Sequence, residues 1–205
     1  MKYTIGIGAL ALAVGVGSAF AQQPPPRPTG QQPTAKSGTA KAGAAKTGSD
    51  ERFVKEAATG GMAEVELGKL ATDKASSGDV KKFGQRMVDD HGKANEELKT
   101  LAQNKNITLP TALDAKAKAT VDRLSKLNGE AFDRAYMQEM LKDHRKDVNA
   151  FRTESTSGKD ADVKAFASKT LPTLEEHLKL AQETNRAVGT SGTAAKKPTS
   201  SKGKR

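Results

Sequence analysis

The chain contains no cysteine and no tryptophan, and aromatic residues make up only 4% of its 205 positions. The lack of cysteine excludes disulfide bonds, thiolate metal ligands, a cysteine nucleophile and a lipid-modified N-terminal cysteine. The fold must therefore be held together by packing and by non-covalent polar contacts alone.

Long apolar runs are also rare. The main one, residues 5–16, is shorter than the roughly 20 residues that a membrane-spanning helix needs. It follows Lys2 and precedes Ala19-Phe20-Ala21, so residues 1–21 have the three parts of a cleavable secretory signal peptide. We predict an exported protein, periplasmic or secreted, with or without attachment to the outer membrane, and with no transmembrane segment after cleavage.

The net charge of +10 is concentrated at the two ends of the chain. Ten of the 34 Lys and Arg residues lie before residue 51 or after residue 189, where Asp50 is the single acidic residue. Residues 51–189 therefore carry a net charge of only +1. We expect the basic ends to contact anionic envelope surfaces through unspecific, salt-sensitive attraction, and we expect no specific nucleic-acid binding.

Composition divides the chain into a folded middle and two tails. Residues 22–49 are rich in Pro, Gln, Ala and Lys without any apolar period, and residues 189–205 are similar, which predicts a disordered linker and a disordered basic tail. Residues 50–188 differ, because proline is absent up to Leu109 and apolar residues recur at spacings of three and four. That period predicts one helical domain.

The apolar period and its interruptions predict five helices. Ser77-Gly78-Asp79 and the segment 157–160 each offer a Gly stop followed by an Asp N-cap, and Thr111 with Asp114 resembles a capping box. Pro172 lies within the last helix and should kink it. The predicted helices cover residues of about 51–76, 79–104, 112–127, 130–156 and 161–187.

A weak internal repeat indicates how the helices are connected. Asp79-Val80-Lys81-Lys82-Phe83 begins the second helix, and Asp162-Val163-Lys164-Ala165-Phe166 lies at the start of the last one. Two hairpins built on one plan, joined by a connection long enough to cross the bundle, predict an all-α, ferritin-like up-down four-helix bundle. The long, partly helical crossover would join the second and third long helices and make them parallel.

The three histidines of the chain are the polar residues that interrupt the apolar helix faces. His91, His144 and His177 each share a face with Leu, Met, Val or Phe residues, and Glu64 lies on the inner face of the first helix. In the predicted topology all four fall in one layer, to within roughly 6 Å along the bundle axis. Glu66 projects to the opposite side.

Two interpretations of this layer remain open. Three neutral imidazoles and a carboxylate are a suitable ligand set for zinc or copper, which makes His91, His144, His177 and Glu64 candidate metal ligands. In the other interpretation, Glu64, Thr170 and their neighbours satisfy the histidines in a structural hydrogen-bonded layer. The acidic residues beside the histidines could orient the imidazoles or could be solvated; they are Asp89, Asp90, Asp143, Glu175 and Glu176.

The same pattern argues against several enzyme classes. A di-iron site of this architecture needs Glu-x-x-His on two helices, whereas Val88, Leu141 and Leu174 stand three residues before the histidines. We therefore predict no catalytic residues and favour a non-enzymatic metal-binding protein. The alternatives are a structural or stress-related interaction module without metal, and a redox enzyme with an atypical metal centre.

Several short segments resemble a known family. They are Met87-Val88-Asp89-Asp90-His91, the segment 64–71, Asp143-His144 and the segment 174–178. Over residues of about 50–188 the chain resembles a bacterial family catalogued as domain of unknown function 4142. The resemblance implies a ferritin-like helical bundle in exported, often periplasmic or outer-membrane-associated, proteins, and it brings no established activity.

Overall fold

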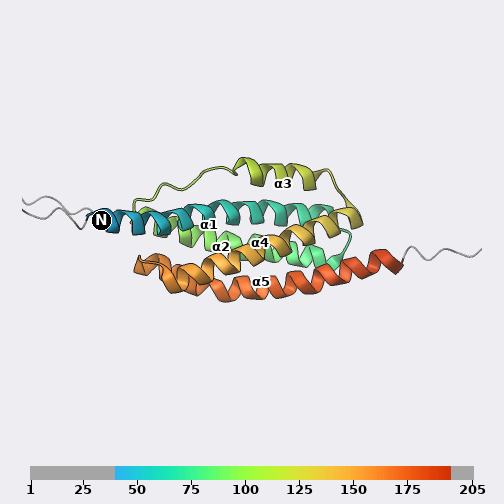
Figure 1. The fold of residues 1–205 in the computed structure, drawn as a ribbon. Helices are drawn as coiled ribbons and strands as arrows, with labels where there is room; N and C mark the ends of the chain where they lie inside the picture. Colours follow the sequence, from blue (N-terminus) through green and yellow to red (C-terminus); the bar gives the residue numbers. More distant parts are fainter. Residues whose placement is uncertain (1–39, 195–205) are drawn as a thin grey trace, which may run out of the picture. The chain divides into compact units, whose positions relative to one another are not determined.

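The computed structural model describes residues 40–194, with side chains described for residues 48–189. Within this range it contains helices and no strands (Figure 1). The predicted signal peptide, residues 22–39 of the predicted linker and residues 195–205 of the predicted tail lie outside the described residues. The helices are α1 (Ala40–Lys74), α2 (Gly78–Asn104), α3 (Ala115–Ser125), α4 (Gly129–Ser157) and α5 (Ala161–Ala194).

The four long helices form two antiparallel hairpins. α1 packs along α2 and α4 packs along α5, while α1 also contacts α4 and α2 also contacts α5. The connection from α2 to α4 returns along the bundle and carries α3 against the outside of α1, so that α2 and α4 run in the same direction (Figure 1). The predicted ferritin-like bundle with a partly helical crossover is confirmed.

Two helix starts differ from the prediction, whereas α5 contains Pro172 as predicted. α1 begins at Ala40, inside the predicted linker, because residues 40–47 consist largely of Ala and Lys, which have high helix propensity. Asp114, rather than Thr111, is the N-cap of α3, and its carboxylate accepts from the Ala117 N–H at 2.7 Å. α5 continues through Pro172, whose ring is on the exposed side, so that water can satisfy the carbonyl that loses its helical donor.

Each hairpin turn is capped by an aspartate from the other hairpin. Asp133 of α4 accepts from the backbone N–H groups of Ser76 and Ser77, at 3.1 and 2.9 Å, and from the Ser76 hydroxyl at 2.6 Å. Asp50 of α1 accepts from the N–H groups of Lys159 and Asp160, at 2.8 and 2.6 Å. These two buried carboxylates satisfy orphan donors near the starts of α2 and α5 and fix the two hairpins against each other.

The repeat seen in the sequence is present in this capping pattern. Asp133 follows Asp50 by 83 positions, which is also the spacing from Asp79 to Asp162. The N-caps correspond too: the Ser77 hydroxyl accepts from the Val80 N–H at 3.4 Å, and the Asp160 carboxylate accepts from the Val163 N–H at 3.2 Å. The two hairpins therefore share one local design.

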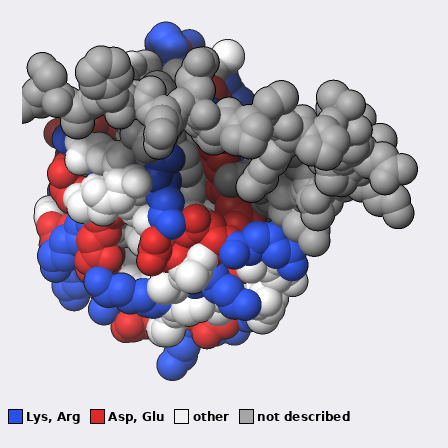
Figure 2. Space-filling model, turned by 90° about the vertical axis from the view of Figure 1, so that its left-hand side faces the viewer, with Lys and Arg blue, Asp and Glu red and all other residues white. Residues whose placement is uncertain are grey.

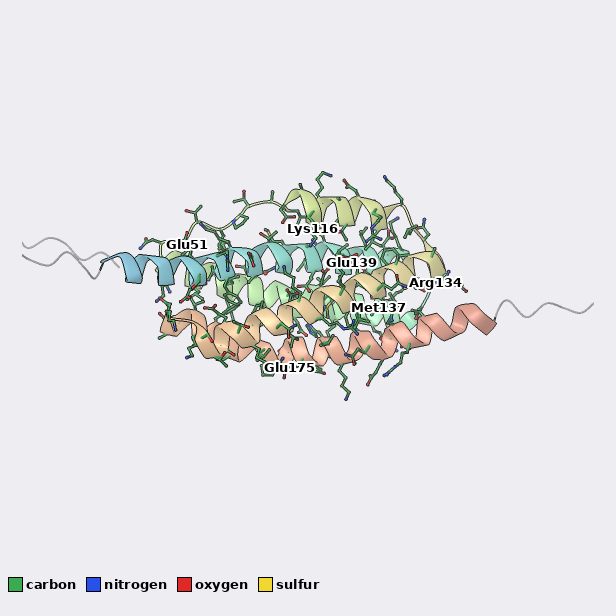
Figure 3. The ribbon with its side chains drawn as sticks, viewed as in Figure 1. Glu51, Lys116, Arg134, Met137, Glu139 and Glu175 are labelled. Carbon is green, nitrogen blue, oxygen red and sulfur yellow. The ribbon has the colours of Figure 1, made fainter. Side chains whose placement is uncertain are left out.

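The core is divided into two apolar clusters. One contains Phe53, Leu98, Phe151 and Phe166 near the start of α1, and the other contains Phe83, Phe132, Tyr136 and Met140 toward the opposite end. Met137 lies between α4 and α5, whereas the charged side chains of Lys116 and Glu175 lie on the outside (Figure 3). Between the clusters lie the buried side chains of Glu64 and the three histidines.

The outer surface agrees with the near-neutral charge of the domain. Where α1 begins, Lys and Arg side chains are interspersed with Asp and Glu (Figure 2). Among residues 40–194, no helix combines the length and the apolar character that crossing a bilayer requires.

Two glycines let α1 and α2 approach closely. A Cβ atom added at Gly84 would lie 2.5 Å from the Ala71 Cβ atom and 2.9 Å from the Gly68 carbonyl oxygen. A Cβ atom added at Gly68 would lie 2.6 Å from the Gly84 carbonyl oxygen. The two backbones are thus in contact at this crossing, and neither glycine leaves room for a side chain.

We expect the Gly84→Ala substitution to lower the free energy of unfolding by about 1–3 kcal/mol, because α1 and α2 must separate to admit the methyl group. Chemical denaturation in the presence of a chelator measures the change. Gly92→Ala on the same helix is the matched control, since an added Cβ atom there has no neighbour within 4 Å. Equal stability of the two variants would contradict the close packing.

Candidate metal centre

Each long helix contributes one buried polar side chain to the middle of the bundle. Glu64 of α1, His91 of α2, His144 of α4 and His177 of α5 are 4%, 6%, 0% and 0% exposed. The ring centroids of the three histidines lie 5.3–5.6 Å apart. The structure therefore brings together all four candidate ligands that the sequence predicted.

Each imidazole has one nitrogen engaged by an oxygen atom. His144 Nδ1 lies 2.9 Å from the Met140 carbonyl oxygen, and His177 Nε2 lies 2.9 Å from Asp90 Oδ2. His91 Nδ1 lies 3.0 Å from Glu64 Oε2. A carbonyl can only accept, so the contact with Met140 places an N–H on His144 Nδ1 and leaves a lone pair on its Nε2 atom. An ionised carboxylate at Asp90 or Glu64 would have the same effect on His177 and His91.

The second nitrogen of each ring has no hydrogen-bond partner. These atoms are His91 Nε2, His144 Nε2 and His177 Nδ1, and all three are buried. One nitrogen of each ring lies within 4.8 Å of one nitrogen of each of the other two rings. Buried polar atoms that remain unpaired are costly and uncommon, and three of them lie together in this layer.

Burial keeps the three rings uncharged near neutral pH. Desolvation lowers the pKa of His91 well below its ordinary value, and the neighbouring His144 and His177 lower it further. Desolvation and the nearby His177 lower the pKa of His144 to about 4. Desolvation also lowers the pKa of His177, although Asp90 opposes the shift. A metal ion would meet three neutral imidazoles and would not have to displace their protons.

Glu64 contacts two of the three histidines. Its Oε2 atom is engaged with His91, while Oε1 lies 3.6 Å from His144 Nε2 and has no hydrogen-bond partner. Burial raises the pKa of Glu64 well above its ordinary value, and the charges of Asp147 and Asp143 raise it further. His91 and Glu64 therefore both favour their uncharged forms, and their contact is a hydrogen bond rather than an ordinary ion pair.

The polar neighbours of the layer agree with the interpretations of the sequence only in part, at Glu64 and Asp90. Thr170 donates to the Phe166 carbonyl at 2.9 Å and not to a histidine. Asp90 orients His177 on α5, not His91 beside it in the chain. The other acidic neighbours on α2 and α5 bind elsewhere: Asp89 accepts from Gln85, Glu175 pairs with Arg152, and Glu176 pairs with Arg86.

Asp147 is the acidic residue that the sequence analysis missed. It lies one turn after His144 on α4, and a small cavity of about 30 Å³ is lined by Asp147, Glu64 and His91, with Thr170 and Gly60. Burial raises the pKa of Asp147 to about 6. Its spacing of three from His144 could have identified it, because residues three apart share a helix face.

The stability that neutral His144 contributes to the metal-free protein should be lost as pH falls from 7 to 4. The unfolded chain protonates His144 near pH 6.5, whereas the folded protein resists protonation down to about pH 4, so the unfolded state binds more protons in this window. We expect His144 to contribute about 3 kcal/mol to the change in the free energy of unfolding over this pH range. Chemical denaturation at several pH values in the presence of a chelator measures this change.

The matched variant for this measurement is His144→Leu, which removes the titrating ring and retains Glu64 and Asp147. The fall in stability with acidification should be smaller in the variant by about 3 kcal/mol. The same pH dependence in both proteins would show that His144 titrates in its ordinary range.

Comparison with known proteins gives a family and two structural relatives. The chain matches the family described as Domain of unknown function (DUF4142) over residues 34–184. A DUF305 protein from Streptomyces coelicolor, described as secreted, is similar in structure, with a TM-score of 0.58, 16% identity and coverage of 68% of this chain and 92% of the relative. A DUF305 fragment from Deinococcus radiodurans has a TM-score of 0.59 and 12% identity, and the match covers 69% and 95% of the two chains.

These structural relatives share the helical fold of this protein. None of the curated proteins compared with the chain matches it. The match to the family extends over well more than half of the chain and includes α2, α3 and α4 in full. The chain therefore belongs to the DUF4142 family.

Proposed function

We propose that this protein is a non-enzymatic, exported metal-binding protein that holds one zinc or copper ion through His91, His144 and His177. The observation that carries the proposal is the set of three buried imidazole nitrogens without a hydrogen-bond partner. A purely structural polar layer would be expected to satisfy its own donors and acceptors.

The contacts on the outer side of the rings support the same conclusion. Metal-ligating histidines usually donate their second N–H to a carboxylate or a backbone carbonyl, which fixes the ring and raises its basicity. Here the partners are Glu64, the Met140 carbonyl and Asp90. A bound cation would favour the ionised form of Glu64, which would then supply negative charge close to the ion.

The spacing of the nitrogens suits an ion that pulls the rings inward. Nitrogens bound about 2.0–2.1 Å from one tetrahedral ion lie roughly 3.3 Å apart. In the structure, one nitrogen of each ring lies within 4.8 Å of the corresponding nitrogens of the other two rings, a limit more than 1 Å longer than the spacing around an ion. Small rotations of the imidazoles can shorten these distances. Imidazole donors suit both zinc and copper.

The size of the space beside the rings favours binding over turnover. The cavity next to His91 has a volume of about 30 Å³, which accommodates one water or one ion. A substrate larger than a few atoms has no room in this cavity.

Export is part of the proposal and rests on separate observations. The sequence of residues 1–21 has the character of a signal peptide. The structural relative from Streptomyces coelicolor is described as secreted. In an envelope compartment, the basic C-terminal tail would meet anionic lipids or surface polymers rather than nucleic acid.

We expect the purified protein to retain one zinc or copper ion per chain in equilibrium dialysis followed by metal analysis. At a free metal concentration of about 100 times Kd, binding to the folded state alone adds about 2.7 kcal/mol of stability. For a domain of this size that corresponds to a rise in Tm of roughly 5–10 °C.

The His144→Ala variant should lose both the bound ion and the rise in Tm. Met140→Leu is the matched control, because it changes a buried side chain one turn away and leaves the carbonyl that orients His144 in place. Retention of no ion by the unmodified protein, or full retention by His144→Ala, would overturn the proposal.

Glu64→Gln tests the role of the carboxylate separately. The amide can still accept from His91 Nδ1, but it lacks the charge that offsets the cation. We expect the same stoichiometry with an affinity weakened about 10–100-fold, measured by isothermal titration calorimetry. An unchanged affinity would show that Glu64 does not act on the ion.

A further inference from the structure

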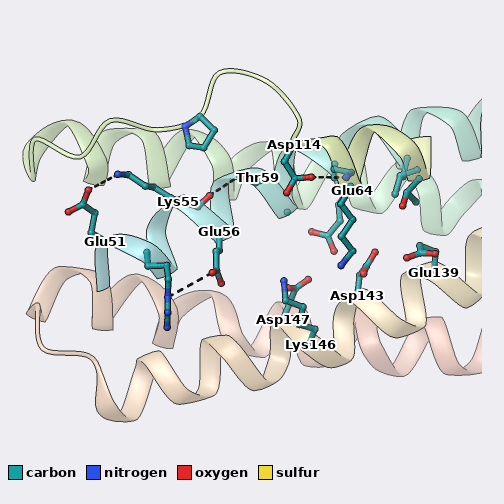
Figure 4. A pocket seen from close by; sticks show the side chains of 18 of the residues that line it. Glu51, Lys55, Glu56, Thr59, Glu64, Asp114, Glu139, Asp143, Lys146 and Asp147 are labelled. Atoms are coloured by element: carbon teal, nitrogen blue, oxygen red, sulfur yellow. Dashed lines mark hydrogen bonds and ion pairs between the residues drawn. The ribbon is translucent and has the colours of Figure 1, made fainter. Parts of the chain in front are cut away.

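A second and much larger cavity lies beneath the crossover. Its volume is about 530 Å³, and its walls are α1, α4 and the crossover segment from Pro110 to Thr120, which includes the start of α3. Figure 4 shows Glu64 of α1 and Asp143 and Asp147 of α4 around the same part of this space. The cavity lies on the α1–α4 side of the histidine layer, and Leu67 of the core lines part of it.

The walls of this cavity are acidic. Seven carboxylates line it against four Lys and Arg side chains, although residues 51–189 as a whole carry a charge of +1. Two of the basic side chains pair locally, Lys55 with Glu51 at 2.6 Å and Arg52 with Glu56 at 3.9 Å. Apart from these two pairs, five carboxylates and two basic side chains, Lys116 and Lys146, line the cavity.

The deep carboxylates lack such partners. Among the described residues, neither Asp143 nor Asp147 forms an ion pair shorter than 4 Å. They are half-buried at a spacing of four on one face of α4, where like charges repel. Burial and the neighbouring Glu139 raise the pKa of Asp143, and the charges of Lys142, Lys116 and Lys146 oppose the shift.

The large cavity and the histidine cavity share a wall. Gly60, Glu64 and Asp147 line both of them. Glu64 is 4% exposed, and its Oε1 atom has no hydrogen-bond partner. Gly60 leaves this wall without a side chain, and a Cβ atom added there would have no neighbour within 4 Å.

We propose that the acidic cavity is the access route by which a hydrated divalent cation reaches the three histidines, passing between Gly60, Glu64 and Asp147. This inference rests on the proposed metal-binding function and adds the route and the charge class of the ion. Asp143 and Asp147 attract and bind the hydrated ion. Glu64 then binds the ion while imidazole nitrogens replace its oxygen ligands.

The donors along the route define the chemical form of the ion. Carboxylate oxygens favour harder, divalent ions, whereas a monovalent copper ion prefers sulfur ligands. Among the described residues that line the cavity, none is methionine or histidine. The route therefore delivers Zn²⁺ or Cu²⁺ and discriminates against Cu⁺.

The Gly60→Leu substitution tests the route, because it should block the passage without changing a proposed metal ligand. In Gly60→Leu the new side chain fills the wall shared by the two cavities. Zn²⁺ association is followed by stopped-flow competition with a zinc-sensitive dye, and dissociation by a chase with excess chelator. Because an obstacle on the path raises the barrier in both directions, both rate constants should fall at least about tenfold while Kd changes less than about twofold.

Gly92→Leu is the matched control, since Gly92 lies beside His91, has no neighbour within 4 Å of an added Cβ atom and lines neither cavity. Its rate constants should equal those of the unmodified protein. Unchanged rates in Gly60→Leu, with zinc still bound, would overturn the route and leave the proposed function standing. The absence of zinc binding in the unmodified protein would overturn both.

Charge removal provides a second measurement. Asp143→Asn should slow Zn²⁺ association several-fold at low salt, and the difference should shrink at high salt, as expected for electrostatic steering. Asp89→Asn is the control, because Asp89 is exposed on α2 and bonds Gln85. Equal association rates in these two variants would contradict the role of the acidic cavity.

Discussion

The structure depends on burying three neutral imidazoles in the middle of an apolar core. The layer of Glu64, His91, His144 and His177 divides the core into two clusters, and each of its members comes from a different long helix. Polar groups at this depth are tolerated only where they are bound by something. Four of the eight nitrogen and oxygen atoms of these side chains are engaged by Glu64, Asp90, the Met140 carbonyl or each other. The other four have no hydrogen-bond partner, and the proposed cation would supply one.

The two hairpins are related by an approximate repeat that the histidines do not follow. At the repeat spacing of 83, Glu64 corresponds to Asp147, whereas His91, His144 and His177 correspond to Leu174, Gly61 and Ala94. A Cβ atom at Gly61 would lie 2.2 Å from Asn95 Oδ1, so the first hairpin has no space for a ring at the position where the second places His144. The symmetry is thus broken at the centre of the bundle, while the reciprocal caps by Asp50 and Asp133 preserve it at both ends.

Much of this arrangement is encoded locally and could be predicted from the sequence. The period of apolar residues identified all five helices and the inner positions of Phe83, Met87 and Phe166, and the length of the connection set the topology. The contacts that involve distant parts of the chain could not be predicted. Asp90 reaches His177 across 87 positions, and Asp50 reaches the turn at Lys159 across 109. These pairs depend on the rotation of one helix against another, which no single helix specifies. The acidic cavity was missed because the crossover that covers it has little apolar period of its own.

The origin of the ligands in both hairpins has a consequence for a chain without cysteine. His91 belongs to the first hairpin, whereas His144 and His177 belong to the second. An ion bound by all three would join two halves that otherwise meet only through packing and a few polar contacts, so it would act as a reversible cross-link. The role that a disulfide plays in many exported proteins would then pass to a coordination bond. The lifetime of the folded state would then depend on the concentration of metal around the protein and not on the redox potential of the compartment.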